Sequence, residues 1–211
     1  MRSVFFLTIV ACSLPSFAEV IDRVAVSMEN RIITSSEVVR QVRITALLNG
    51  TEPDLGASSR REAAERLVDQ TLIRREISTS NYVPDAAVHS KQMYAEFRKR
   101  FSSEEQYRGS LAKYRLTDAD VREAFDWQAT FLDFIEVRFR PGVTIPQDEL
   151  QAFYNEQFSA ASSPEAKMSF DEARPRIEVL LMQQRVDNAL DRWLGQVRTQ
   201  TRIRYRDEAF Q

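Results

Sequence analysis

The sequence predicts a mainly α-helical protein with a small β-sheet. Glycine is scarce, at five residues, and 28% of the residues are charged, a composition that favours helices over a turn-rich β architecture. Helix-start signals of the Ser/Thr-x-x-Glu type occur at Thr34, Ser59, Ser102 and Ser169, with a weaker version at Thr117. Near both ends of the sequence, apolar and polar residues alternate, which is the pattern of a strand and not of a helix. We therefore expect a multi-helix domain with one small sheet.

Seven helices are expected in order along the chain. Thr34 caps the start of the first, and Asn49 and Gly50 close its end. Pro84 and Pro146 lie where the first turn of a helix tolerates a missing backbone donor. Helices are predicted at residues 36–48, 60–79, 85–100, 103–114, 118–139, 146–158 and 170–199.

Two regions of the sequence fit strands better than helices. Val20–Met28 and Ile32–Ile33 flank a short polar turn, and Arg202–Arg206 alternates Ile203 and Tyr205 with arginines. Isolated hairpins are marginally stable. We therefore expect the C-terminal strand to join the N-terminal pair in one sheet that ties the two chain ends together.

The first residues of the chain have the order of a secretory signal peptide. Arg2 precedes an apolar run, Val4–Leu14, and the small residues Ser16 and Ala18 then occupy the positions that signal peptidase reads. We therefore expect cleavage after Ala18, removal of residues 1–18 and a periplasmic protein.

Two alternative interpretations of this segment stay open. A membrane anchor needs about 20 apolar residues, and this run is shorter and is broken by Pro15. A lipoprotein signal would leave Cys12 lipidated, although the apolar stretch before Cys12 is short for that class. Cys12 is the only cysteine in the chain, so its removal would leave no disulfide and stability would come from packing. After residue 18 no apolar run is long enough to span a bilayer.

Residues 19–211 are expected to form a single domain. The clearest break is Ser159–Met168, where small residues show no helical stripe. It separates an N-terminal segment, residues 19–158, from a C-terminal helix and strand, residues 169–211. An apolar stripe at spacings of three and four predicts that this helix packs back onto the N-terminal segment through Val179, Met182, Val186, Leu190, Trp193 and Val197.

The sequence offers no candidate catalytic, cofactor-binding or metal-binding residue. The single histidine, His89, shares a helical stripe with Met93 and is interpreted as a packed or partly exposed residue. Asp118, Asp120 and Glu123 begin a predicted helix, where acidic residues complement the helix dipole. Phosphate-binding glycine loops and zinc-ligand spacings are absent, and a net charge of -2 does not suggest a nucleic-acid partner. We expect no enzyme activity and no cofactor.

Several blocks of the sequence share their order and packing patterns with one known family. They are VIDRVAVSMENRIITSSEV from Val20, ERLVDQTLIRREI from Glu65, FLDFIEVRFRPGVTIPQDELQAFYNEQF from Phe131 and SFDEARPRIEVLLMQQRVDNALDRWL from Ser169. In this order they resemble the N-terminal domain family of SurA-type periplasmic chaperones (SurA, PpiD and PrsA). The resemblance implies a mainly α, trigger-factor-like peptide-binding domain with a small sheet. It is carried by packing patterns and covers most of the chain after residue 18.

The chain departs from this family between its last two blocks. Relatives usually carry one or more parvulin prolyl isomerase domains there, whereas here Ser159–Met168 is an interval of ten residues. A folded domain takes about 50 residues or more, so none fits. The resemblance therefore implies an ATP-independent chaperone, without isomerase activity, for unfolded outer-membrane or secreted proteins and extended apolar or aromatic peptides.

A chaperone needs apolar side chains that its own fold leaves accessible. Each candidate stripe is also compatible with ordinary core. The candidate client-binding residues are Met93, Phe97, Tyr107, Leu111, Tyr114, Phe125, Phe131 and Phe134.

Two other functional hypotheses stay open. One is a structural or adaptor subunit that binds a single envelope partner. The other, weaker one is a remnant isomerase. The sequence also leaves open whether two copies form a homodimer by exchanging their C-terminal helices.

Overall fold

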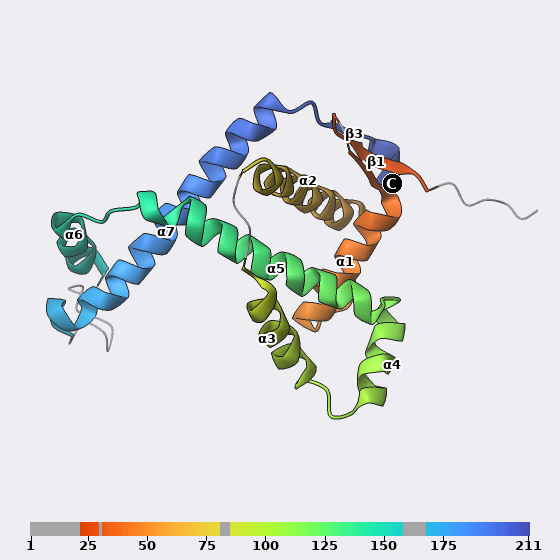
Figure 1. Ribbon diagram of the computed structural model, residues 1–211, viewed down its shortest axis with the longest axis horizontal. Helices are drawn as coiled ribbons and strands as arrows, with labels where there is room; N and C mark the ends of the chain where they lie inside the picture. The colour runs from red at the N-terminus through yellow and green to blue at the C-terminus, as the bar shows by residue number, and fades with distance from the viewer. Residues whose placement is uncertain (1–21, 30, 81–84, 158–167) are drawn as a thin grey trace, which may run out of the picture.

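A computed structural model describes residues 22–29, 31–80, 85–157 and 168–211 (Figure 1). Across these residues the chain is mainly helical and carries a small antiparallel sheet, as the sequence predicts. The described residues include two short 3-10 helices, η1 (Arg140–Gly142) and η3 (Asp207–Ala209). The other elements, in chain order, are β1 (Val24–Ser27), β2 (Ile32–Thr34), α1 (Ser35–Asn49), α2 (Ala57–Thr79), α3 (Ala87–Arg98), α4 (Glu104–Tyr114), α5 (Asp118–Arg138), α6 (Gln147–Gln157), α7 (Phe170–Gln200) and β3 (Arg204–Tyr205).

Most helix ends follow the local capping signals. Gly50 ends α1 in the left-handed region, with φ of 70° and ψ of 26°, a conformation that a residue without a Cβ adopts at little cost. Reciprocal capping boxes form at three of the predicted helix starts and pair Thr34 with Glu37, Thr117 with Asp120 and Ser169 with Glu172.

Two predicted capping residues were wrong, at the starts of α2 and α4. Ser59 does not cap α2, because its hydroxyl donates to Asp54 at 2.6 Å and the helix begins earlier in the chain. Ser102 does not cap α4 either. The neighbouring Ser103 accepts a hydrogen bond from the backbone amide of Gln106, while the Gln106 side chain accepts from the amide of Ser102. The capping chemistry is therefore present one residue later than expected.

The sheet joins the two ends of the described chain. Its strand order is β2-β1-β3, and β1 pairs antiparallel with both neighbours, so that Val26 faces Ile33 on one side and Tyr205 on the other. The register shifts between Val24 and Val26, where β1 and β2 form an irregular pair. Arg206 extends the β1–β3 pairing by donating its amide to the carbonyl of Ala25 at 2.9 Å. The predicted tie between the chain ends is confirmed.

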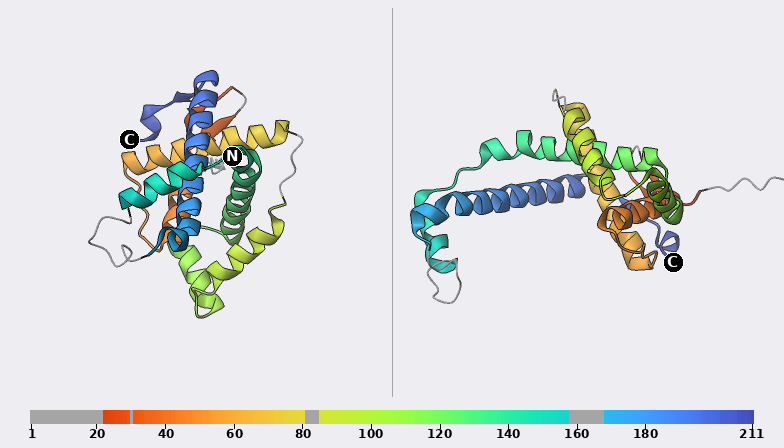
Figure 2. Two further views of the ribbon diagram at one scale, coloured as in Figure 1. Left: turned by 90° about the vertical axis from the view of Figure 1, so that its left-hand side faces the viewer. Right: turned by 90° about the horizontal axis from the view of Figure 1, so that it is seen from below.

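Two apolar clusters fill the body of the molecule. The first packs the sheet against α1 and α2 and includes the C-terminal residues Ala209 and Phe210. The second packs α1 against α3, α4 and α5 around Tyr107, Phe125 and the fully buried Val121. Helix α7 leaves this body, crosses the C-terminal end of α5 and extends to α6, at the end of the molecule far from the sheet (Figure 1, Figure 2).

Helix α7 uses opposite faces along its length. Near its N-terminus Ile177 and Leu181 pack against α6, whereas Val186 and Leu190 pack against the end of α5. Val179 was predicted to be core, and this prediction was wrong, because 67% of its surface is exposed. Val179 lies on the same face of α7 as Val186 and Leu190. Helix α5 covers this face only further toward the C-terminus of α7, so it does not reach Val179.

The rest of the predicted C-terminal stripe is buried or half-buried. Its members are Met182, Val186, Leu190, Trp193 and Val197.

Some sequence-based expectations lie outside the described residues. These are the leader at residues 1–18, the beginning of the strand at 20–28, Pro84, and the linker apart from its last residue, Met168. Met168 belongs to the cluster between α6 and α7, and its carbonyl accepts a hydrogen bond from the Tyr154 hydroxyl at 2.7 Å. Among the described helices, none is long and apolar enough to cross a membrane.

Candidate functional site

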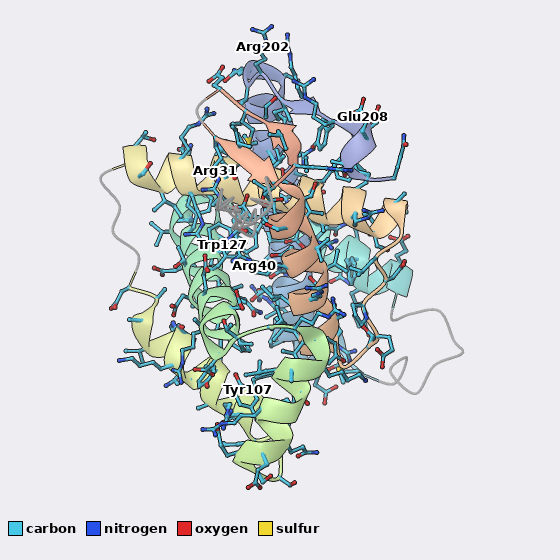
Figure 3. The ribbon with its side chains drawn as sticks, turned by 90° about the vertical axis from the view of Figure 1, so that its right-hand side faces the viewer. Arg31, Arg40, Tyr107, Trp127, Arg202 and Glu208 are labelled. Carbon is cyan, nitrogen blue, oxygen red and sulfur yellow. The ribbon has the colours of Figure 1, made fainter. Side chains whose placement is uncertain are left out.

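A cleft of about 490 Å³ opens where α1, α2 and α5 meet below the sheet. Its volume falls in the range of about 300–1,000 Å³ that is usual for ligand sites. Arg31, Arg40 and Trp127 approach it from the β1–β2 turn, α1 and α5 (Figure 3). The lining residues are Arg31, Ile33, Glu37, Arg40, Gln41, Ile44, Thr45, Leu48, Leu67, Gln70, Thr71, Arg74, Asp120, Glu123, Ala124, Trp127 and Gln128.

Helical periodicity explains which residues reach the cleft. On α2 the lining residues Leu67, Gln70, Thr71 and Arg74 recur at spacings of three and four, so they share one face of the helix. The same spacing holds on the other two helices, through Arg40, Gln41, Ile44, Thr45 and Leu48 on α1 and Asp120, Glu123, Ala124, Trp127 and Gln128 on α5. Each helix therefore presents one mixed polar and apolar face to the same space.

The floor of the cleft is apolar. Ile33 belongs to the cluster under the sheet, and Ile44 belongs to the cluster between α1 and α3–α5; both side chains are buried. Leu48, Leu67 and Ala124 are half-buried against these clusters. The floor is thus built from residues that belong to or pack against these two clusters, which gives the cleft an apolar base.

Two ion pairs stand at the rim of the cleft. Arg31 donates to Glu37 at 2.8 Å, and Arg40 lies 3.6 Å from Asp120, which joins α1 to α5. Both carboxylates also complete capping boxes, since Glu37 accepts from the amide of Thr34 and Asp120 from the amide of Thr117. These carboxylates are therefore held in place by the helix starts.

Arg74 and Glu123 differ from these pairs. Among the residues that the structure describes, neither side chain has a hydrogen bond or an ion pair within 4 Å. The guanidinium of Arg74 lies 4.6 Å over the ring of Trp127. Although Arg74 is exposed, partial burial of its guanidinium lowers its pKa, the charge of Glu123 raises the pKa and that of Arg31 lowers it. Arg74 stays charged and offers free donors to a ligand.

The cleft is electrically balanced. Arg31, Arg40 and Arg74 face Glu37, Asp120 and Glu123, so the formal charges of its lining cancel.

The uncharged polar part of the lining is rich in amides. Gln41 comes from α1, Gln70 from α2 and Gln128 from α5. In the described ranges, no side chain or backbone group forms a hydrogen bond with these three amides.

The eight residues predicted to bind clients lie elsewhere. None is part of the cleft lining. Their burial supports the alternative interpretation, in which these stripes are core. The structure buries Phe97, Tyr107, Leu111, Tyr114, Phe125 and Phe134 and half-buries Met93 and Phe131, in the clusters that pack α3, α4, α5 and α7.

Tyr107 shows why these aromatic residues are fixed in place. Its hydroxyl donates to Asp118 at 2.7 Å, and the hydroxyl of Tyr94 donates to the same carboxylate oxygen at 2.5 Å. Burial first, and then the hydrogen bond to Asp118, raise the pKa of Tyr107 far above its usual range. A tyrosine held by such a bond is a structural residue of α4. His89, in contrast, lies exposed on α3.

A second hollow, of about 610 Å³, lies between the end of α5 and α7. Its arginines already have partners within the protein. Arg185 donates to the carbonyl of Thr144 at 2.8 Å and pairs with Glu149, and Arg138 lies 3.7 Å from Glu76. This hollow therefore offers less free polar chemistry than the cleft.

Comparison with known proteins adds no assignment to this geometry. No protein-family model matches the chain, and no curated protein matches its sequence. Within the described residues, no group of three or more histidine, cysteine or acidic side chains could hold a metal ion. The cleft thus combines an apolar floor, a balanced charged rim and free amides.

Proposed function

We propose that the protein is an ATP-independent chaperone that holds extended apolar segments of unfolded proteins in the cleft between α1, α2 and α5. The observation that carries the proposal is the cleft itself, in which an apolar floor is flanked by side chains that still have free hydrogen-bonding groups. The resemblance of the sequence to SurA-type chaperone domains supports the same function.

The energetics of such a site suit reversible holding. Burial of apolar surface stabilises a complex by about 25 cal/mol per Å², and ordering an extended segment opposes it. A cleft of about 490 Å³ covers a short stretch of chain, so we expect weak binding and fast exchange. Release then needs no nucleotide, in keeping with a sequence that lacks a phosphate-binding loop.

The proposed setting is the periplasm. It rests on the leader-like residues 1–18, and the proposed clients are outer-membrane or secreted proteins in transit. Strands of outer-membrane barrels alternate apolar and polar residues, a pattern that suits an apolar floor with polar walls. Isomerase and other enzyme activities are not part of the proposal.

The test is light scattering of a chemically denatured outer-membrane protein that is diluted with and without the purified protein, in the absence of ATP. We expect suppression of aggregation near equimolar ratio. Gln128→Arg, which places a long charged side chain in the cleft, should weaken the suppression. Gln92→Arg makes the same change on an exposed position of α3 and should not. Absence of suppression by a folded wild-type protein would refute the proposal.

A second candidate is an adaptor subunit that binds one envelope partner. The observation that favours it is apolar surface on α7, where 67% of Val179 and 46% of Leu180 are exposed. An adaptor should co-purify with one protein in a fixed ratio, and Val179→Ser with Leu180→Ser should release that protein. A chaperone should instead protect several unrelated clients and tolerate these two changes.

A further inference from the structure

The free amides of the cleft indicate what part of a client is recognised. Gln41 and Gln70 are half-buried and Gln128 is exposed, and each comes from a different helix around the same space. A glutamine amide offers two donors and an acceptor. Each residue of an extended polypeptide offers one backbone donor and one acceptor. An amide side chain can therefore pair with either group of a peptide unit.

The charges of the cleft point to an uncharged segment. Arg74 on α2 and Glu123 on α5 are close enough for their charges to interact, yet they do not form an ion pair among the described residues. A ligand carboxylate would be attracted to Arg74 and repelled by Glu123, and a ligand ammonium would experience the reverse. A peptide unit satisfies both, because its carbonyl accepts from a guanidinium and its N–H donates to a carboxylate.

The floor supplies the remaining contacts. In an extended segment alternate side chains point to one face, and the apolar floor around Ile44, Leu67 and Ala124 can take them. It carries no polar side chain that would select one apolar side chain over another. Specificity therefore rests on backbone geometry and on the absence of charge.

We infer that the cleft binds an extended, electroneutral polypeptide segment of another protein by hydrogen bonds between the side-chain amides of Gln41, Gln70 and Gln128 and the main-chain N–H and C=O groups of the segment. The inference deepens the proposed function and rests on it. It names the substrate class as uncharged main chain with apolar side chains on one face.

The test uses Trp127 as a probe within the binding site. The chain has two tryptophans, so Trp193→Phe leaves Trp127 as the reporter, provided that the variant still melts cooperatively. The probes are a short capped peptide of alternating valine and threonine, the same peptide with alternate backbone nitrogens methylated on its bonding edge, and two versions with threonines replaced by glutamate or lysine.

The unmodified peptide should bind most tightly. Methylation removes backbone donors without adding charge, and loss of two or three hydrogen bonds should weaken binding about tenfold. Both charged peptides should bind several-fold more weakly than the neutral one. Equal affinity for methylated and unmodified peptides, or tighter binding of the glutamate peptide, would overturn the inference.

Matched variants locate the contacts. Gln41→Leu, Gln70→Leu and Gln128→Leu together keep side-chain size, and we expect about tenfold weaker binding of the unmodified peptide and no remaining discrimination against methylation. The control combines the same change at three glutamines outside the cleft lining, Gln92, Gln184 and Gln196, and should bind as the wild type does.

Two readouts separate the inference from the proposed function. Where the protein suppresses aggregation but neither the peptides nor the triple variant behave as expected, the function stands and the inference fails. Where a folded protein neither suppresses aggregation nor binds any peptide, both fail. Binding of the unmodified peptide that is lost only in the cleft variant supports both.

Discussion

Asp118 connects three helices through one carboxylate. Tyr94 from α3 and Tyr107 from α4 donate to one of its oxygens, and Arg122, a turn later on α5, donates to the other at 2.6 Å. The rings of both tyrosines are also covered by guanidinium groups, with Arg98 3.6 Å from the Tyr107 centroid and Arg122 4.0 Å from that of Tyr94. Every donor in this group favours the ionised carboxylate.

This arrangement predicts an acid-sensitive contribution to stability. Burial alone would raise the pKa of Asp118, but the hydrogen bonds from Tyr94, Tyr107 and Arg122 outweigh it and lower the pKa from 3.8 to about 2. A depressed pKa means that the stabilisation is present above pH 3.8 and is lost as the pH falls toward 2. Because 42% of the side chain is exposed, solvent screening reduces the effect, and we expect about 1 kcal/mol.

The measurement is urea unfolding of the wild type and of Asp118→Asn between neutral pH and pH 2. The difference in free energy of unfolding should be largest at neutral pH and shrink on acidification. Asp191→Asn changes an exposed aspartate on α7 and serves as the control. A difference that stays constant over the whole pH range would contradict this account of Asp118.

At the scale of elements, Trp193 holds α7 against α5. Its ring lies 5.7 Å from that of Phe134 and 5.9 Å from that of Phe139, between centroids. Trp193→Ala removes a half-buried aromatic side chain from this cluster and should lower the free energy of unfolding by about 3 kcal/mol. Val179→Ala on the exposed stretch of the same helix should change it by less than about 0.5 kcal/mol. Chemical denaturation of both variants checks the pair, and equal effects would disprove the assignment of the two faces.

Local signals explain why the elements could be predicted. Capping residues, turn formers and apolar periodicity are properties of short stretches of sequence, and they placed every described α-helix and strand near its observed position, whereas the two short 3-10 helices η1 and η3 were not predicted. Val179 escaped this reasoning, because its burial depends on where α5 ends relative to α7, which is a tertiary property. The capping role predicted for Ser59 was wrong because its hydroxyl bonds to Asp54, five residues earlier in the chain, instead of capping α2.

The cleft could be predicted only in part. Spacing shows that Leu67, Thr71 and Arg74 share a helix face, but not that this face meets those of α1 and α5. The aromatic stripes could not be assigned from the sequence, because large apolar side chains such as Phe125 mark cores and binding surfaces alike. That Gln41, Gln70 and Gln128 have no hydrogen-bond partner among the described residues is visible only when their neighbours in space are known.

At the scale of the whole molecule, the C-terminal segment closes the body. Arg198 on α7 donates to Asp69 on α2 at 2.6 Å, and the guanidinium of Arg61 lies 3.8 Å over the ring of Tyr205. Arg60 donates to the carbonyl of Phe210 at 2.9 Å across a separation of 150 residues. Helix α2 is thus held to the chain end by several independent contacts.

A chain that ends before Ser169 should therefore lose its solubility. It lacks α7 and β3, which exposes the clusters around Phe134 and Val26 and leaves one edge of β1 unpaired. We expect aggregation on size-exclusion chromatography, and recovery of soluble complex when residues 169–211 are supplied as a separate chain. A truncated protein that is soluble and melts cooperatively would contradict this view of the assembly.

The strand order β2-β1-β3 also has a consequence in time. Synthesis runs from the N-terminus, so β1 and β2 can pair early. The other edge of β1 stays unpaired until β3 has been synthesised, more than 170 residues after β2 begins. Contacts of such high sequence separation form late and slowly. The sheet therefore cannot be completed until Arg204 and Tyr205 of β3 have been synthesised.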